Sequence, residues 1–376
     1  MIFREGQQLE RSQAPSPAAV FARFHIDLPL LTGLLLLCGA GLFVLYSATG
    51  QSVAQTTAQA IRLVIALIAM VMLAQIPPIV FRRWAWAGYA LGLALLIVVL
   101  IAGVSGKGAQ RWIDIGFRFQ PSEIMKIAVP MMAAAYLHSR TLPPNFRTLV
   151  VLIAIITMPA VLIARQPDLG TAILISAAGC IVILLAGLRM RVIVGMAALV
   201  AAALPLLWQN MREYQRQRVL TLIDPQSDPL GAGYNIIQSK IAIGSGGLFG
   251  KGWTNGSQGQ LEYLPERSTD FIFAVIGEEF GLLGLLTFIC LYLFVVGRGL
   301  YIASQAGDTF TRLLAGSISL TFFVYVLVNT AMVTGLIPVV GVPLPLVSYG
   351  GTSMVTLMGA FGILMSIHTH KRLLPR

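Results

Sequence analysis

Apolar segments of about 20 residues recur ten times along this chain of 376 residues. Each is long enough to cross the ~30 Å hydrocarbon core of a bilayer as a helix. Of the residues, 57% are hydrophobic and 11% are charged, whereas roughly a quarter are charged in soluble domains. The sequence therefore predicts an all-α, polytopic membrane protein with about ten transmembrane helices. The expected spans are 28–48, 54–76, 84–104, 121–138, 147–165, 169–187, 190–208, 270–296, 310–336 and 347–368.

Basic residues are spread unevenly over the links between these spans. The arginine-bearing links are 82–83, 138–147, 189–191 and 298–312. They fall on one side of the membrane together with the polar N-terminal segment, 1–27, and the basic C-terminal tail. Because basic residues concentrate in cytoplasmic links, both termini are expected in the cytoplasm. No cleavable signal peptide is expected, since the first apolar segment lacks a small-residue cleavage site. Residues 28–376 are then a single membrane domain.

The net charge of +11 and the three cysteines exclude some classes of function. In a membrane protein a basic excess indicates orientation and attraction to anionic lipid, and no basic, aromatic-interleaved motif indicates nucleic-acid binding. Cys38, Cys180 and Cys290 all lie in apolar segments, far apart in sequence. No pattern of metal ligands and no nucleotide-binding loop occurs, so zinc chemistry and ATP hydrolysis have no support.

One long extracytoplasmic loop, 209–269, separates the seventh and eighth spans and is longer than a connector needs. Within it, 234–243 has amphipathic helical periodicity, includes Lys240, and is followed by a glycine-rich run. Such a helix can lie in the membrane interface. The shorter loop 104–121 carries Arg111, against the positive-inside trend, so its charges need another explanation.

Three sites with acidic residues stand at or inside the predicted spans, where charge is costly and usually functional. Glu123 and Lys126 are three residues apart and share one helix face; they either neutralise each other or line a polar cavity. Asp168 either caps the helix beginning near Leu169 or serves the site. Glu278 and Glu279 must face protein or water; they either pair with basic residues of other spans, such as Arg62, or are functional.

Asp270 stands at the mouth of the eighth span, directly after the long loop. It is either a capping carboxylate or a general base, since a partly desolvated carboxylate can accept a proton from a hydroxyl. Arg267 is near enough in sequence to hold an anionic leaving group. The Pro/Gly-dense link between the last two spans contains Ser348, and a re-entrant or tightly packed loop beside the site is expected there.

Several of these motifs together resemble the SEDS family (shape, elongation, division and sporulation proteins), from about residue 28 to the end. Other features of the sequence favour the elongation branch over the division branch. Ser268 stands where many relatives carry His, which argues mildly against a catalytic role there. The motifs are Lys107-Gly108-Ala109-Gln110-Arg111-Trp112, Gln120-Pro121-Ser122-Glu123, Gln166-Pro167-Asp168-Leu169-Gly170-Thr171, Pro265-Glu266-Arg267 with Thr269-Asp270-Phe271-Ile272-Phe273, and Pro345-Leu346-Val347-Ser348-Tyr349-Gly350-Gly351.

The resemblance implies ten transmembrane helices in the bacterial inner membrane, with a large extracytoplasmic loop between helices 7 and 8. It implies a peptidoglycan glycosyltransferase that polymerises lipid II, releases undecaprenyl pyrophosphate and maintains rod shape. The implied partners are a class B penicillin-binding protein, other elongation-complex proteins and membrane lipids. The acid that the family requires matches Asp270.

The residues then suggest roles in such a reaction. Asp270 is the expected base, and Glu123 with Lys126 is expected to organise the site. The pyrophosphate is expected to contact Arg111, Lys240 and Arg267, alone or with a Mg²⁺ or Mn²⁺ ion, while Asp168, Ser348, Glu278 and Glu279 are further polar candidates. Two other classes stay open: a flippase for the lipid-linked precursor, which Arg62 and the paired glutamates favour, and a non-enzymatic scaffold for the transpeptidase.

Overall fold

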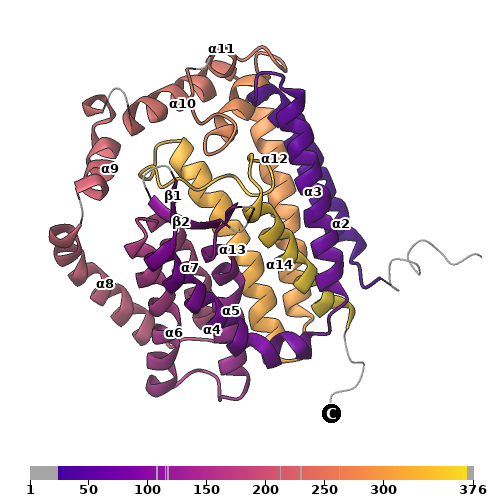
Figure 1. The fold of residues 1–376 in the computed structure, drawn as a ribbon, viewed down its shortest axis with the longest axis vertical. Helices are drawn as coiled ribbons and strands as arrows, with labels where there is room; N and C mark the ends of the chain where they lie inside the picture. Colours follow the sequence, from indigo (N-terminus) through magenta and orange to yellow (C-terminus); the bar gives the residue numbers. More distant parts are fainter. Residues whose placement is uncertain are drawn as a thin grey trace, which may run out of the picture.

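Ten long helices, one for each predicted span, form the body of the molecule in a computed structural model (Figure 1). The structure describes residues 24–106, 109–114, 116, 118–211, 213–228, 231–261 and 263–370. The helices are α2 (Leu28–Ala48), α3 (Val53–Ala74), α4 (Pro78–Ala102), α5 (Ser122–His138), α6 (Phe146–Arg165), α7 (Leu169–Leu185), α8 (Met190–Asn210), α12 (Ile272–Ser304), α13 (Thr309–Val333) and α14 (Thr352–Thr369).

Seven of these helices are long and apolar enough to cross a membrane: α2, α3, α4, α6, α12, α13 and α14. Helix α7 and the first part of α8 are shorter apolar helices, and α5 carries a charged pair. The polytopic, all-α fold is confirmed. Several helices begin directly after a residue whose side chain can cap a helix N-terminus. Asp27, Ser52 and Asn145, for example, each accept a backbone N–H of the helix they precede.

Three span boundaries differ from the prediction by five residues or more. Helix α4 begins at Pro78 rather than at 84, because proline suits the first turn of a helix and Arg82 and Arg83 are helical. Helix α12 runs on to Ser304, beyond the predicted end at 296. Helix α14 begins at Thr352 rather than at 347, because the preceding residues belong to the non-helical link.

Helix α13 is the centre of the bundle. Two thirds (67%) of its most apolar 18-residue window is buried, and it packs against α12, α7 and α5. Helix α14 packs along α3 and completes this core. Helix α8 lies at the rim in Figure 1, and α9 (Glu213–Ile223) leads from it towards α10. The apolar surface of the outer helices is left to face lipid, as the high exposure of residues such as Ile61 and Ile68 on α3 shows.

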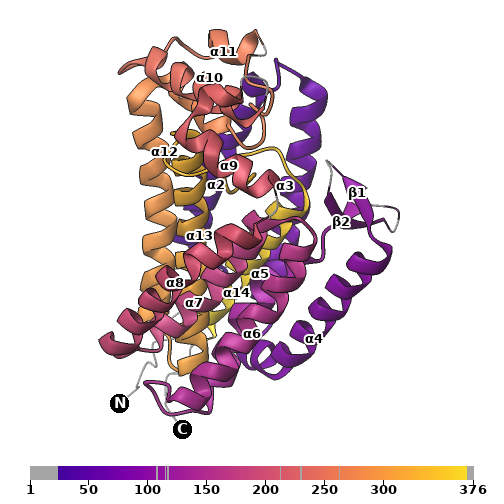
Figure 2. The same cartoon turned by 90° about the vertical axis from the view of Figure 1, so that its left-hand side faces the viewer.

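The long loop and the loop 104–121 contain regular structure of their own. The long loop folds into α9, η1 (Pro225–Ser227), α10 (Ala232–Gly246) and α11 (Ser257–Gln260), and α10 contains the predicted helix 234–243. Helices α10 and α11 cover one end of the bundle (Figure 2). The loop 104–121 forms an unpredicted antiparallel sheet, ordered β1 (Val104–Gly106), β2 (Ala109–Asp114), β3 (Arg118–Phe119). Strands this short carry too little alternation to be read from sequence.

Near its N-terminal end, α12 consists of two helical pieces joined at Gly281, whose φ is +64°. The chain that follows α10 supplies partners for both broken ends. The backbone N–H groups of Lys251 and Gly252 donate to the carbonyls of Glu278 and Glu279, at 3.0 Å each. Beyond the break, the N–H groups at 282 and 283 donate to the carbonyls at 247 and 248. The loop thus repairs the hydrogen bonds that the kink removes.

The other end of the bundle is closed by an ion-pair cluster around Asp27. Its carboxylate accepts Nε and Nη2 of Arg298 at 3.0 and 2.6 Å, and His368 Nε2 lies 3.2 Å away. Burial disfavours the charge, but the hydrogen bonds from Arg298 and from the Leu30 N–H outweigh burial and lower the pKa of Asp27. The cluster joins the start of α2 to α12 and α14.

Candidate active site

Asp270 lies two residues before the first helical residue of α12 and is half-buried. The N-cap position is Phe271, whose side chain makes no capping hydrogen bond, so Asp270 lies one residue before the cap. Its carboxylate faces the link between α13 and α14. At Gly341 of that link, where φ is +73°, an added Cβ would lie 3.6 Å from Asp270 Oδ2. The positive φ favours glycine at this position, and the link passes close to the carboxylate there.

The link 334–351 is non-helical and packs into the protein, as predicted. Ser348 is 5% exposed; its Oγ accepts the Leu344 N–H at 2.8 Å and donates to the Thr269 carbonyl at 2.5 Å. A small hollow lies along the link, walled by residues that include Tyr325, Pro343, Ser348 and Ser353. Ser348, one of the residues that line this hollow, is thus hydrogen-bonded to Thr269, the residue before Asp270.

Glu123 and Lys126 form the predicted pair at the N-terminal end of α5. Glu123 Oε1 lies 2.7 Å from Lys126 Nζ, and the two side chains are 5% and 10% exposed. The ammonium also lies 5.2 Å from the centre of the Tyr325 ring on α13. A second small hollow, between α5, α13 and α14, is lined by Lys126, Thr321 and Tyr325 among others. Tyr325 and Leu357 line both hollows, so the charged pair stands beside the space that borders the link.

Asp168 caps α7 by accepting the Thr171 N–H at 3.3 Å, and it also anchors the small sheet. Gln120 Nε2 donates to its Oδ2 at 3.1 Å, and Arg111 Nη1 lies 3.7 Å from the same oxygen. Arg111 Nη2 donates to the Pro167 carbonyl at 3.0 Å. The capping interpretation is confirmed, and Asp168 holds Arg111 close to the top of α7.

Arg267 and Lys240 lie on the loop side of the site. The Arg267 guanidinium donates to the Ala48 carbonyl at 2.8 Å and to the Gly259 carbonyl, so it fastens the turn before Asp270 to α2 and α11. Lys240 is exposed on α10 and reaches over the start of the link, where a Cβ at Gly335 would lie 2.8 Å from its Nζ. Their contact with pyrophosphate stays a prediction.

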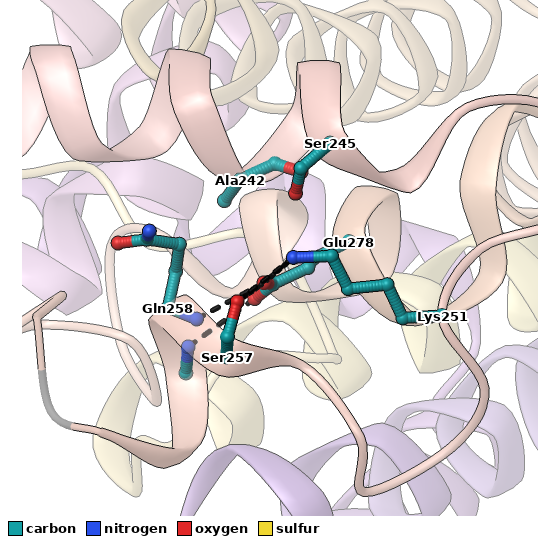
Figure 3. A network of polar contacts seen from close by, with 7 residues as sticks. Ala242, Ser245, Lys251, Ser257, Gln258 and Glu278 are labelled. Carbon is teal, nitrogen blue, oxygen red and sulfur yellow. Dashed lines mark hydrogen bonds and ion pairs between the residues drawn. The ribbon is translucent and has the colours of Figure 1, made fainter.

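Glu278 and Glu279 are buried and are held by the loop, not by Arg62 as expected. Glu278 Oε1 lies 2.7 Å from Lys251 Nζ and accepts the Ser257 hydroxyl and the Gln258 N–H at 3.1 and 3.0 Å (Figure 3). Glu279 accepts the hydroxyl of Ser47 on α2. The pairing with Arg62 was wrong because the chain after α10 folds back to the kink of α12.

Arg62 itself lies over the ring of Tyr349, 4.6 Å from its centre, and donates to Gln59. Together with the contacts of the two glutamates, this means that the charges that favoured a flippase all have packing partners within the described residues.

The sequence and fold agree with those of known proteins. The family model FTSW_RODA_SPOVE, described as "Cell cycle protein", matches residues 21–373. The chain belongs to this FtsW/RodA/SpoVE family. It is 51% identical to "Peptidoglycan glycosyltransferase MrdB" of Escherichia coli (strain K12), over 96% of this chain and 98% of that protein. It is 37% identical to "Probable peptidoglycan glycosyltransferase FtsW" of Trichlorobacter lovleyi, over 94% and 96%.

Two solved structures share the FtsW/RodA/SpoVE fold. One, described as "Structural coordination of polymerization and crosslinking by a peptidoglycan synthase complex", contains a chain with a TM-score of 0.82 and 26% identity, covering 92% of this chain and 99% of that one. The other is Rod shape determining protein RodA of Thermus thermophilus, with a TM-score of 0.69 and 25% identity, covering 91% and 96%. The family resemblance inferred from the motifs is confirmed.

Within this family fold, the described residues contain no group of three or more His, Cys, Asp or Glu side chains that could hold a metal ion. Asp270 and the Glu123–Lys126 pair would each offer a divalent ion few protein ligands. Mg²⁺ is often held by one or two carboxylates together with substrate phosphates. A Mg²⁺ or Mn²⁺ ion at this site would therefore depend on oxygen atoms of the substrate.

Several residues that shape the site were not singled out from the sequence. Asn329 on α13 is fully buried and contacts both the Asp270 turn and the link. Gln59 on α3 is 1% exposed, donates to the Ser348 carbonyl at 3.3 Å and accepts the Gly350 N–H. Tyr325 on α13 lines both hollows. The available signal was a polar side chain within an apolar span, which deserves the same scrutiny as a charge.

Proposed function

We propose that this chain joins lipid II units into glycan strands at the outer face of the bacterial inner membrane, with Asp270 as the general base. The chain is a peptidoglycan glycosyltransferase of the elongation type, as its 51% identity to MrdB over nearly the whole length indicates. The observation that carries the proposal is the placement of Asp270 directly before α12, with its carboxylate facing the buried link.

The chemistry needs one base. Asp270 takes the proton from the 4-hydroxyl of the acceptor sugar, and that oxygen attacks the anomeric carbon of the donor. The bond to undecaprenyl pyrophosphate breaks with inversion, and the electron pair leaves with the phosphate oxygen. Inverting hydrolases use two carboxyl groups, because a sugar leaving group must be protonated. Pyrophosphate leaves as an anion, so nearby cations replace the acid.

The cations at the site differ in how available they are. Lys240 is exposed above the link, and Arg111 is held at the top of α7 by Asp168. Arg267 donates to two backbone carbonyls, so its first role is to hold the turn. Lys126 is neutralised by Glu123 and acts within the hollow. We therefore favour Lys240 and Arg111 for the leaving pyrophosphate.

The proposed orientation places both termini in the cytoplasm and Asp270 towards the periplasm. The arginine-bearing links lie at the end of the bundle opposite α10 and α11, which supports this orientation through the positive-inside rule. The proposed partner is a class B penicillin-binding protein. The similar chain in a peptidoglycan synthase complex, which couples polymerisation to crosslinking, supports this.

Replacing Asp270 with Asn tests the base directly, because the amide keeps the size of the side chain but cannot accept the proton. We expect Asp270→Asn, purified with the partner transpeptidase, to lose at least a hundredfold in lipid II polymerisation, in line with the roughly 10²–10⁴-fold contribution of a general base. Asp224→Asn, which removes an exposed carboxylate from the same outer loop, should polymerise like the wild type. Near-normal polymer from folded Asp270→Asn would sink the assignment.

A further inference from the structure

Three consecutive backbone carbonyls of the turn that carries Asp270 are each held by a donor from the last two spans or their link. The Ser268 carbonyl accepts the Tyr349 N–H at 2.8 Å. The Thr269 carbonyl accepts the Ser348 hydroxyl at 2.5 Å. The Asp270 carbonyl accepts Asn329 Nδ2 at 2.8 Å. The turn belongs to no helix or strand, so these bonds replace the partners that regular structure would have supplied.

Two of these donors also hold the link that faces Asp270. Asn329 Nδ2 donates a second bond, at 2.7 Å, to the carbonyl of Val342, next to Gly341. Ser348 Oγ accepts the Leu344 N–H at 2.8 Å. Each side chain therefore bridges the turn and the link. Because Gly341 passes close to the Asp270 carboxylate, the two bridges fix both sides of the space in which that carboxylate sits.

Asn329 is costly where it stands. Its side chain is 0% exposed in an apolar helix, and its Oδ1 has no hydrogen-bond partner in the structure. A buried amide without full pairing costs free energy that an apolar side chain would not. Met332 and Val333, one turn further along α13, are buried apolar residues. Packing at this level of the helix therefore does not require a polar side chain. The free-energy cost of burying this amide indicates that Asn329 has a role other than packing.

We propose that Asn329 and Ser348 are positioning residues that hold Asp270 at the height and angle its reaction requires. The inference rests on the proposed role of Asp270 as the base. Proton transfer needs the carboxylate within hydrogen-bond reach of the sugar hydroxyl. A displacement of about 1 Å at a reacting group can cost on the order of 10²-fold in rate. Neither residue needs to touch the substrate to have this effect.

The test measures kcat and KM for lipid II separately in Asn329→Leu and Ser348→Ala. Leucine keeps the branching of asparagine but removes both donated bonds, and alanine removes only the hydroxyl. We expect kcat to fall ten- to a hundredfold in each variant, with KM within threefold of the wild-type value. Ser348→Cys, which restores a weak donor of similar size, should recover part of the loss. Thermal unfolding of the purified proteins checks that each variant is folded.

Ser317→Ala is the matched control, because Ser317 is also fully buried on α13 but donates to the Ala178 carbonyl, far from the turn in sequence and in the fold. Its kcat should stay within twofold of the wild type. The proposal is overturned if both test variants keep kcat within twofold, if the loss is carried by KM, or if Ser317→Ala loses as much.

Asp270→Asn, assayed in parallel, separates the two proposals. Inactive Asp270→Asn with active Asn329→Leu and Ser348→Ala overturns only the positioning role. Active Asp270→Asn overturns the base itself, whatever the other variants do.

Discussion

The Glu123–Lys126 pair is the site feature that physical chemistry constrains most tightly. Both side chains are nearly buried at the outer end of α5, and the pair is close at 2.7 Å. Removing one partner of a buried ion pair leaves a lone charge, whereas replacing both with apolar or neutral groups is often tolerated. Single and double variants therefore separate a structural from a functional role.

We expect Lys126→Met alone to cost roughly 3–5 kcal/mol of stability, because it leaves the Glu123 carboxylate buried without its cation. The double variant Glu123→Gln with Lys126→Met should regain most of that stability, measured by thermal unfolding in detergent. We also expect its polymerisation to stay at least tenfold below the wild type, because Lys126 lines the hollow beside Tyr325. A stable double variant with normal polymerisation would make the pair purely structural.

Among single residues, charge drew attention in the sequence, whereas neutral polar residues did not. Sequence alone singled out Asp270, Glu123 and Asp168 as candidates, because acids at span ends are costly and rare. It did not locate Asn329, whose importance depends on which carbonyls lie opposite it in the folded chain. The contact with Asp270 joins residues 59 positions apart in sequence, and the contact with Val342 joins residues 13 apart. No local sequence pattern encodes either contact.

The break in α12 shows how one glycine can join two elements. At Gly281 the backbone has φ +64°, and an added Cβ would lie 2.4 Å from the Gly250 backbone nitrogen. The loop from α10 thus meets the helix at a point that only glycine allows. The same loop brings Lys251 to the buried carboxylate of Glu278 (Figure 3).

We expect Gly281→Ala to destabilise the protein markedly and to loosen the loop, because backbone atoms rather than a flexible side chain occupy the space. A fall of several degrees in the unfolding temperature and faster proteolysis within 247–260 would show this. Gly297→Ala is the control on the same helix; nothing lies within 4 Å of its added Cβ. It should be neutral or stabilising by up to ~1 kcal/mol, the difference in helix propensity. Equal effects from the two substitutions would refute this account.

Elements were predicted well where their signal is long and periodic. All ten spans correspond to helices, and α10 was expected from its amphipathic pattern and glycine stop. The small sheet and the break in α12 were missed, because two- to six-residue strands and a single glycine inside an apolar run carry little local signal. The break depends on the loop that packs against it, which is a tertiary effect.

As a whole, the molecule has two chemically different ends. One end carries Asp270, the link, the small sheet and the helices of the long loop. The other carries the arginine-bearing segments 82–83, 138–147, 189–191 and 298–312 and the Asp27 cluster that joins α2 to α14. A bilayer makes these ends inequivalent, since basic links stay in the cytoplasm. The chemistry of lipid II polymerisation then belongs to the periplasmic end only if the orientation is as proposed.

That orientation can be tested with single cysteines in a background lacking Cys38, Cys180 and Cys290. Gly307→Cys lies in the exposed link between α12 and α13, and Asp224→Cys lies in the long loop. A membrane-impermeant maleimide should label Asp224→Cys in intact spheroplasts and leave Gly307→Cys unlabelled until the membrane is permeabilised. Labelling of Gly307→Cys in sealed spheroplasts would invert the topology. It would also place Asp270 on the cytoplasmic side. A base there could not take part in glycan polymerisation on the periplasmic side.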